Sequence, residues 1–512
     1  MIRVVILMIP ILMVLVSGCQ NHTSAMKEPV SVHKSDPQVI HYISPQGNDS
    51  NKGTIQSPWK TLQHAADHAS PGSIIYLREG VYHQKVKITR SGNSSANPTL
   101  FSSYPQEQVI IDGKGLSVRG IEGLIEIENA SYITIQNLEI RNFTTTLGGQ
   151  VPTGIYVHGA GEHIQLLGNT IHAISSYAPP EGPDLRGRDA HGIAIYGTEH
   201  PQALRDIIIK DNELYDLTLG SSESLAVNGN VDTFAIQDNI IHDSDNIGID
   251  LIGYEGTSED DTYDQARNGI VRGNEVYDIT SNNNPSYGTD LPNDTNSAGG
   301  IYVDGGKDHI IDQNRVYRSD IGIEIASEHA GRSTSNITVR DNLIYSNRLT
   351  GIAMGGYDEE RGATEDSKIM YNTLMGNDTL NAGNGQLFMQ SRTKNNTFMR
   401  NILVSGSSEV LIYNEYTSNT GNVFDHNVYY SPGEQEDALW VWKNKGYSGI
   451  AAYIKGSGND AHSIYVNPAF MDEPSEDFRP QANLRLRRMV TLLRDKSTLS
   501  LPSQLSQSVS RK

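Results

Sequence analysis

Three acidic residues occupy one recurring phrase, in which a glycine is followed by alternating apolar residues. Asp250 lies in residues 248–251 (Gly-Ile-Asp-Leu), Asp304 ends residues 300–304 (Gly-Ile-Tyr-Val-Asp), and Glu324 lies in residues 322–325 (Gly-Ile-Glu-Ile). Paired carboxyl groups hydrolyse glycosidic bonds, one acting as acid and the other as base or nucleophile. Crowded carboxyls also raise one another's pKa, so that one of them stays protonated near neutral pH. The pattern therefore predicts acid–base chemistry on glycans.

Strands are the elements that must position these acids, because apolar residues alternate with period two. If Ile249 and Leu251 point into a core, Asp250 points out of it, and the same logic places Tyr302, Asp304 and Glu324 outside. Strands in neighbouring repeats lie ~4.8 Å apart and residues ~3.3 Å apart along a strand, so Asp304 is ~8 Å from each of the other acids at the backbone. That spacing leaves retention and inversion both open.

A second phrase, apolar-x-x-Asn-x-apolar, recurs through the middle of the chain. Its asparagines stand at 137, 169, 212, 239, 274, 314, 342, 372, 401 and 427, with an average spacing of about 32. Short strands separated by turns at such a period predict an all-β parallel β-helix, in which the asparagines stack from coil to coil. A β-propeller is the alternative, but spacings that vary from 26 to 43 suit coils better.

Composition limits the partners. The 512 residues carry a net charge of −20, which repels nucleic acid, and 37% are hydrophobic, which is enough for a core. We therefore expect a polysaccharide or oligosaccharide partner and no nucleic acid.

The N-terminus predicts export. Arg3 and an apolar run over 4–16 precede Ser17, Gly18 and Cys19, the only cysteine in the chain. Residues 1–18 have the pattern of a secretory signal peptide, and the run is too short to span a membrane. The residues before Cys19 resemble a bacterial lipobox, which implies lipidation of Cys19 and a tether over 19–38. The protein would then be anchored in the bacterial cell envelope, at the outer membrane if the cell is Gram-negative. An ordinary signal peptide is the alternative.

Residues 42–82 resemble the entry segment of right-handed parallel β-helix proteins that act on polysaccharides, including the β-helical pectate lyases. The resemblance rests on residues 42–49 (Tyr-Ile-Ser-Pro-Gln-Gly-Asn-Asp), 53–62, 71–76 and 80–82. It implies a right-handed parallel β-helix, here over 39–483. Residues 59–69 have helical spacing and would cap its N-terminal end. Residues 484–512 are basic and are predicted to form a poorly ordered tail.

Two resemblances point to different reactions. Residues 244–250 (Ser-Asp-Asn-Ile-Gly-Ile-Asp, after Asp243) are similar to the calcium-ligand phrase of pectate lyases. That similarity implies that Asp243, Asp245 and Asp250 could hold Ca²⁺. Those lyases carry a lysine base on a later coil, whereas residues 300–304 contain none and Lys307 follows the turn. A polyuronate would also require a cationic lining, which this face does not offer.

The second resemblance is to β-helical β-xylosidases. Asp304 and Glu324 on successive coils, with His329 shortly after, are similar to their acidic pair. This resemblance implies a glycoside hydrolase in which Asp304 and Glu324 are the catalytic pair and Asp250 assists. Glu328 could tune or replace Glu324.

The remaining predicted site residues share the outward face or the turns beside it. Insertions at 173–190, 254–267, 279–298 and 355–367 would wall a cleft over this face. We expect sugar contacts from Tyr196, Tyr254, Tyr302, His158, Asn228 and His329. Hydrolysis of a largely neutral glycan would require no cofactor, although Ca²⁺ remains an option. The alternatives are a calcium-assisted polysaccharide lyase and a non-catalytic glycan-binding or adhesion solenoid.

Overall fold

The computed structural model describes residues 38–183 and 185–480. The signal segment, Cys19, residues 19–37 of the tether and the basic tail lie outside the described residues. No helix in the described part of the chain is both long and apolar enough to cross a membrane.

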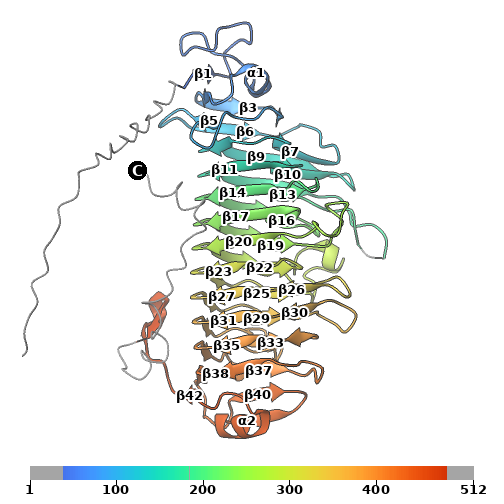
Figure 1. The fold of residues 1–512 in the computed structure, drawn as a ribbon, viewed down its shortest axis with the longest axis vertical. Coiled ribbons are helices and arrows are strands. Elements are labelled where there is room, and N and C mark those ends of the chain that lie inside the picture. The colour runs from blue at the N-terminus through green and yellow to red at the C-terminus, as the bar shows by residue number, and fades with distance from the viewer. Residues whose placement is uncertain (1–37, 184, 481–512) are drawn as a thin grey trace, which may run out of the picture. The chain divides into compact units, whose positions relative to one another are not determined.

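In the described residues three sheets of 13 strands each run side by side, and from β2 to β40 the chain visits them in turn on each coil (Figure 1). Sheet 1 consists of β1 (Ile40–Ile43), β2 (Ile74–Leu77), β5 (Thr99–Ser103), β8 (Ile133–Gln136), β11 (Gly161–Leu167), β14 (Leu204–Lys210), β17 (Val231–Gln237), β20 (Arg267–Arg272), β23 (Ile310–Asp312), β27 (Thr338–Arg340), β31 (Lys368–Met370), β35 (Thr397–Met399) and β38 (Val423–Asp425).

Sheet 2 carries the glycine-apolar phrases. Its strands are β4 (Val86–Ile88), β7 (Ile121–Glu128), β10 (Val151–His158), β13 (His191–Gly197), β16 (Leu225–Gly229), β19 (Ile249–Ile252), β22 (Gly299–Asp304), β25 (Ile321–Ala326), β29 (Thr350–Met354), β33 (Leu387–Met389), β37 (Val410–Asn414), β40 (Leu439–Trp442) and β41 (Gly446–Ser448). All neighbours pair in parallel except β40 and β41, which pair antiparallel at its end.

Sheet 3 follows the asparagine turns. Its strands are β3 (Gly80–Tyr82), β6 (Val109–Asp112), β9 (Glu139–Thr145), β12 (Thr170–Ser176), β15 (Glu213–Leu217), β18 (Ile240–Ser244), β21 (Glu275–Ile279), β24 (Arg315–Tyr317), β28 (Leu343–Tyr345), β32 (Thr373–Met375), β36 (Ile402–Val404), β39 (Val428–Tyr430) and β42 (Ile464–Tyr465). Smaller elements are β26 (Ser333–Ser335), β30 (Ala363–Glu365) and β34 (Thr393–Lys394), the hairpin β43 (Phe470–Asp472) and β44 (Asp477–Pro480), and the 3₁₀ turns η1 (Pro285–Tyr287) and η2 (Glu473–Ser475).

The interior is filled by one apolar residue above another. Ile249 and Leu251 are fully buried, and the residues paired with them in register, Ile301 and Val303, are also core residues. Because each coil has too little apolar surface to form a core alone, stacking provides the burial. The predicted parallel β-helix is confirmed.

A ladder of buried asparagines lines the turn between sheets 1 and 3. Asn274 Nδ2 donates to Asn314 Oδ1 at 3.0 Å and to the carbonyl of Ile236 at 3.0 Å, and Asn274 N donates to Asn314 Oδ1 at 2.9 Å. The same pattern joins the asparagines at 169, 212, 239, 274, 314, 342, 372, 401 and 427. Asn137 does not belong to the ladder, which corrects the predicted start. Leu138 takes the ladder position on that coil and donates its N–H to Asn169.

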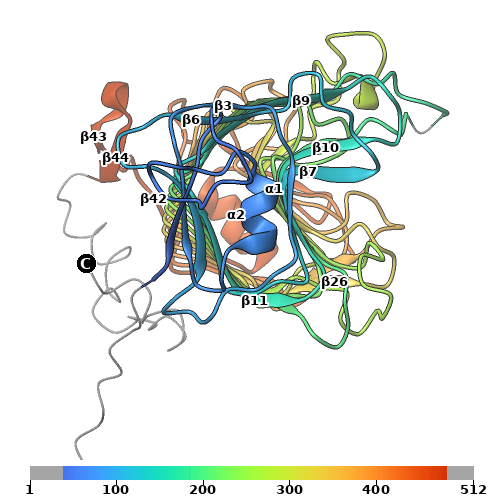
Figure 2. The same cartoon turned by 90° about the horizontal axis from the view of Figure 1, so that it is seen from above.

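Helices lie at the two ends of the solenoid. The helix α1 (Leu62–His68) begins at Thr61, whose side chain accepts from His64 N, and it buries Leu62, Ala65 and Ala66. Viewed along the stack, α1 lies over the space that the three sheets enclose (Figure 2). The helix α2 (Ile450–Ser457) buries Ile450 and Tyr453 at the other end. The predicted N-terminal cap is thus present, and it covers an apolar core that would otherwise face water.

Candidate active site

The structure brings the three predicted acids together on sheet 2. Asp250 on β19 pairs with Tyr302 on β22, and Tyr302 pairs with Glu324 on β25. The side chains of Asp250, Tyr302 and Glu324 therefore form one outward column. Asp304 lies two residues further along β22, opposite Ala326. The acids therefore have the diagonal arrangement expected from strand alternation.

These acids leave the core but do not lie open to solvent. Asp250, Asp304 and Glu324 are only 3%, 4% and 7% exposed, because the segments beside sheet 2 cover them. Burial disfavours the charged form of a carboxyl. The cluster therefore combines a position outside the hydrophobic core with the desolvation typical of catalytic groups.

Burial raises the pKa of Asp304 and of Glu324 to about 8. After burial, the nearby carboxyl of Glu328 is the largest contribution to both of these raised pKa values. Opposing contacts act on Asp304, whose Oδ1 accepts from Glu328 N at 2.8 Å and whose carboxylate is favoured by nearby His329. On Glu324 the opposing contact is a hydrogen bond with Gln390. The two acids thus titrate well above the usual range for carboxyls.

The pKa of Asp250 is raised as well. Burial and then the carboxyls of Glu223 and Asp304 raise its pKa well above the usual value. Its Oδ1 is buried and has no hydrogen-bonding partner among the described residues. A buried oxygen in this state costs stability unless the group is protonated or a ligand donates to it.

Two acids missed by the strand analysis, Glu223 and Glu255, complete the cluster. Glu223 precedes β16, and burial together with Glu255 and Asp189 raises its pKa well above the usual value. Glu255 Oε1 lies 3.2 Å from His329 Nε2, where the carboxylate can accept the ring N–H. These residues lie in turns, where period-two alternation makes no prediction. Only their position next to the Asp250 and Glu324 strands could have indicated them.

A cavity of about 540 Å³ opens beside Glu324. Its acidic and amide lining comes from Glu324, Glu328, Gln390, Asn296 and Asn384, and its aromatic lining from Tyr287, Tyr302, Tyr357 and Phe388. No lysine or arginine is among its lining residues. The insertions predicted to form walls contribute Tyr287, residues 295–297 and Tyr357. Aromatic faces with a few polar groups suit a neutral sugar.

The predicted sugar-binding residues separate into two groups. Tyr302 lies in the cluster, where its hydroxyl donates to Glu328 Oε1 at 3.4 Å, and His329 contacts Glu255. Tyr254 follows β19 with φ 72°, and the Arg332 guanidinium lies 4.8 Å from its ring centre. Tyr302 and His329 therefore border the acids, whereas the contacts of Tyr254 are with Arg332 and Gln265.

The other three predicted contacts lie toward the N-terminal coils. The Tyr196 hydroxyl is 3.1 Å from His191 Nε2, and Asn228 pairs with Tyr196 in register. Burial lowers the pKa of His191 to about 4, so this ring is neutral. His158 stacks on Tyr156 and contacts Glu126 at 3.0 Å, three strands from Asp250. His158 therefore belongs to a separate cluster.

Asp243 and Asp245, expected as calcium ligands, have other partners. Asp243 lies on β18 of sheet 3, where its carboxylate is 2.7 Å from His242 Nδ1. Asp245 accepts from Leu219 N at 2.5 Å and lies 3.6 Å from Arg188. In the described residues neither belongs to a group of three converging ligand atoms, whereas Glu255, Asp304 and His329 form such a group within 4.8 Å. Those three could hold a divalent cation.

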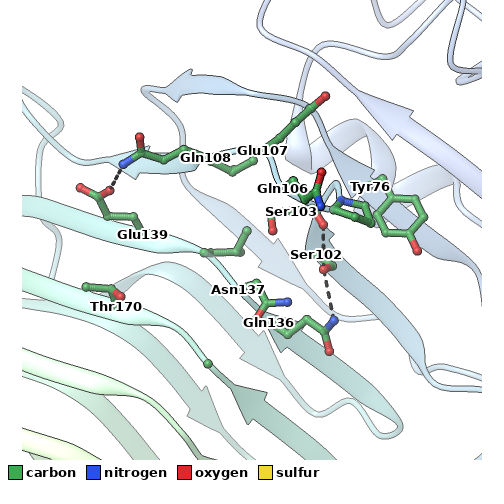
Figure 3. A pocket seen from close by; sticks show the side chains of 14 residues that line it. Tyr76, Ser102, Ser103, Gln106, Glu107, Gln108, Gln136, Asn137, Glu139 and Thr170 are labelled. Carbon is green, nitrogen blue, oxygen red and sulfur yellow. Dashed lines mark hydrogen bonds between the residues drawn. The ribbon is translucent and has the colours of Figure 1, made fainter.

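A second cavity of about 540 Å³ lies far from the acids, at the turn between sheets 1 and 3 (Figure 3). Its visible polar contacts are internal: Gln108 donates to Glu139 at 2.9 Å and Gln136 to Ser102 at 3.3 Å. Glu139 also pairs with Arg141. Of the acids in the candidate site, Glu324 and Glu328 line the first cavity, and none lines the second.

Comparison with known proteins defines the class. A family model described as "Pel9A-like, right handed beta helix region" matches residues 41–195. The chain is thus a right-handed parallel β-helix protein, as the resemblance of its N-terminal segment implied. The match ends before Glu223, so it does not reach the acidic cluster.

The chain belongs to the family of the uncharacterized protein YwoF of Bacillus subtilis. The two are 43% identical over 438 residues, which cover 85% of this chain and 90% of that protein. The pectate lyase PEL9 of Emericella nidulans is 32% identical over 167 residues, 30% of this chain and 37% of that enzyme.

A solved structure extends the likeness in fold. The GH136 lacto-N-biosidase of Eubacterium ramulus aligns with a TM-score of 0.51 and 16% identity, covering 84% of this chain and 66% of that one. At this identity the likeness shows the fold alone. The matched family and the relatives with a named activity are carbohydrate-active proteins.

Proposed function

We propose that this protein is a glycoside hydrolase that cleaves a largely neutral glycan, with Asp304 and Glu324 as its acidic pair. The observation that carries the proposal is the position of Glu324 in a cavity walled by aromatic and amide side chains, one strand from Asp304. The pKa of each carboxyl is raised to about 8. Such acids can exchange protons with a sugar substrate near neutral pH.

The contacts of the two acids suggest their roles. Asp304 accepts a backbone N–H and lies near His329, and both contacts favour its carboxylate. Asp304 is therefore the base or nucleophile. Glu324 faces the cavity beside Phe388 and Tyr302 and supplies the proton to the leaving oxygen. Asp250, whose Oδ1 lacks a partner, is the assisting acid that donates to a sugar hydroxyl or to Asp304.

A lyase is the second candidate, favoured by the matched Pel9A-like region and the likeness to PEL9. Lyase cleavage removes the proton next to a uronate carboxylate and usually needs a cation to neutralise that carboxylate. The cavity lining has no lysine or arginine. The backbone of Lys307 forms β-bridges with Arg267 and Ser335, beside sheet 1. Within the Glu255–Asp304–His329 group, the two carboxylates could supply oxygen ligands to Ca²⁺ for such a reaction, whereas the imidazole could not.

We also propose that a lipid on Cys19 anchors the protein to the bacterial cell envelope. The support is the sequence preceding Cys19 and the absence of any other cysteine.

Product analysis on a panel of glycans tests the function. Hydrolysis releases new reducing ends without ultraviolet absorbance, whereas a lyase also creates an unsaturated, absorbing uronate. Neutral glycans should be cleaved without added calcium. An absorbing product that requires Ca²⁺ would overturn the hydrolase in favour of the lyase, and binding without any cleavage would favour a non-catalytic solenoid.

A further inference from the structure

Two histidines and one aspartate meet where the last coil contacts the C-terminal cap. Asp425 ends β38, His426 follows it, and His462 lies between α2 and β42. Asp425 Oδ2 is 2.7 Å from His462 Nδ1 and 3.1 Å from His426 Nδ1. The two imidazole rings stack with their centres 5.0 Å apart. One carboxylate oxygen therefore faces two ring nitrogens.

The other oxygen of the same carboxylate holds the backbone. Asp425 Oδ1 accepts from His426 N at 2.9 Å and from His462 N at 2.8 Å. These two bonds fix the orientation of the carboxylate and of both segments that carry the histidines. Such supporting contacts are typical of metal sites, because ligands must be oriented before a metal arrives.

The donor set suits a borderline metal ion. The three ligand atoms lie within 4.8 Å of one another, and neutral imidazole with carboxylate suits Zn²⁺ and similar ions. His426 Nδ1 is buried and has no hydrogen bond of acceptable geometry among the described residues, so a metal would displace no hydrogen bond there. His462 Nδ1 is hydrogen-bonded to Asp425 Oδ2 at 2.7 Å, and a metal that binds between them would displace the proton that they share. His462 is 68% exposed, which gives an ion access from solvent.

Two of the other comparable clusters, both outside the candidate active site, are already neutralised by cations. Glu126 and Glu128, near His158, each lie 2.9 Å from Lys87 Nζ. Glu162, near His163 and Asp206, is bound by Arg205 and by the Tyr132 hydroxyl. Among the described residues no lysine or arginine forms an ion pair with Asp425, so a metal would meet no competing charge there.

We propose that Asp425, His426 and His462 form a site for one Zn²⁺ or a chemically similar ion, which ties the C-terminal cap to the last coil. Three protein ligands leave a fourth position for water. The ion would join residues on either side of α2, so its binding free energy would stabilise the C-terminal end of the solenoid.

Calorimetric titration of the EDTA-treated full chain with ZnCl₂ near neutral pH tests this site. We expect one ion per chain. His426→Ala and His462→Ala should each weaken binding by more than about 10-fold. Zinc should also raise the melting temperature of the wild type, and this shift should disappear in His462→Ala. Because His462 is largely exposed, its replacement leaves no core void, and the melting temperature without zinc should stay unchanged.

Two control variants test whether zinc binds at this site and not at another acidic cluster. His163→Ala removes a histidine from the Glu162 cluster, and Asp304→Asn alters the acidic cluster of the candidate active site; both should retain zinc binding. The proposal is overturned if the wild type binds no zinc, if both Asp425-adjacent histidines are dispensable, or if Asp304→Asn removes the binding instead.

Discussion

The backbone N–H of Glu328 donates to Oδ1 of Asp304 at 2.8 Å, across the turn that follows β25. This bond and nearby His329 favour a charged Asp304, whereas burial opposes it. The protonation state of Asp304 therefore depends on two opposing effects: the contacts with the turn favour the carboxylate, and burial among other acids favours the protonated form. The pH dependence of activity should follow from this balance.

Activity should show a narrow maximum near pH 8. Asp304 must be deprotonated, so activity falls as pH drops below its pKa of about 8. Glu324 must be protonated, so activity falls as pH rises above its pKa of about 8. The two groups interact, so kcat/KM measured against pH reports values that belong to the pair. A maximum at pH 4–5, typical of ordinary carboxyls at about pKa 4, would contradict this account.

Asp250→Asn should raise stability, and more at high pH than at low pH. The folded state raises the pKa of Asp250 above its unfolded value, so the folded chain binds more protons between those values. The stability that protonated Asp250 contributes is present below the unfolded pKa and is lost as pH rises. The amide removes that loss, so the melting temperature at pH 8 should increase by about 2–4 °C.

The matched control is Asp216→Asn, the same change at an exposed position on sheet 3. Thermal unfolding of both variants at pH 5 and pH 8 separates the effects. An equal shift in the two variants, or a larger shift for Asp250→Asn at pH 5, would show that Asp250 is not buried in an acidic cluster.

Asn314→Ala should destabilise the solenoid by about 2–5 kcal/mol, because it leaves the buried donors of Asn274 without their acceptor and removes a donor from the buried oxygens of Asn342 and Val271. Asn314 accepts from Asn274 N and Nδ2 and donates to Asn342. Chemical denaturation measures the free energy of unfolding. Asn137→Gly is the control, since Asn137 is exposed with φ 56° and Gly168 follows at the matching turn. Similar losses in both variants would argue against the ladder.

Cys19→Ala should release the protein from the membrane fraction of a bacterial host, because the proposed lipid would have no attachment point. Cell fractionation and incorporation of labelled fatty acid measure this. Cys19→Ser should behave in the same way. A wild-type protein that is soluble and unlabelled would rule out the anchor.

Sequence periodicity predicted most of the fold, because strand alternation and stacked turns are local patterns that repeat at every coil. It also placed Asp250, Asp304 and Glu324 on one face, since adjacent coils share a register. Strand periodicity did not identify Glu223 and Glu255, because they lie in turns, where the direction of a side chain depends on the path of the whole loop. Asn137 was misplaced by one residue, because in the frame Ile135-x-x-Leu138-x-Ile140 the ladder position belongs to Leu138 and the asparagine stands one residue earlier.

The sequence also did not predict that the acids are buried. The walls that cover Glu324 come from segments 287–297 and 357, whose conformations are set by contacts such as Tyr287 Oη to Asn246 Oδ1 at 3.1 Å. The lengths of the insertions predicted walls beside sheet 2. The raised pKa values of the acids, however, depend on how closely these walls pack over them.

The most direct test of the central claim is the turnover of Asp304→Asn and Glu324→Gln on a glycan that the wild type cleaves. Each substitution removes one proton-transfer group while preserving shape, so kcat should fall by about 10²-fold or more, with melting temperatures at least as high as the wild type. Asp216→Asn should retain full activity. Wild-type turnover in both Asp304→Asn and Glu324→Gln would show that the acidic pair lies elsewhere.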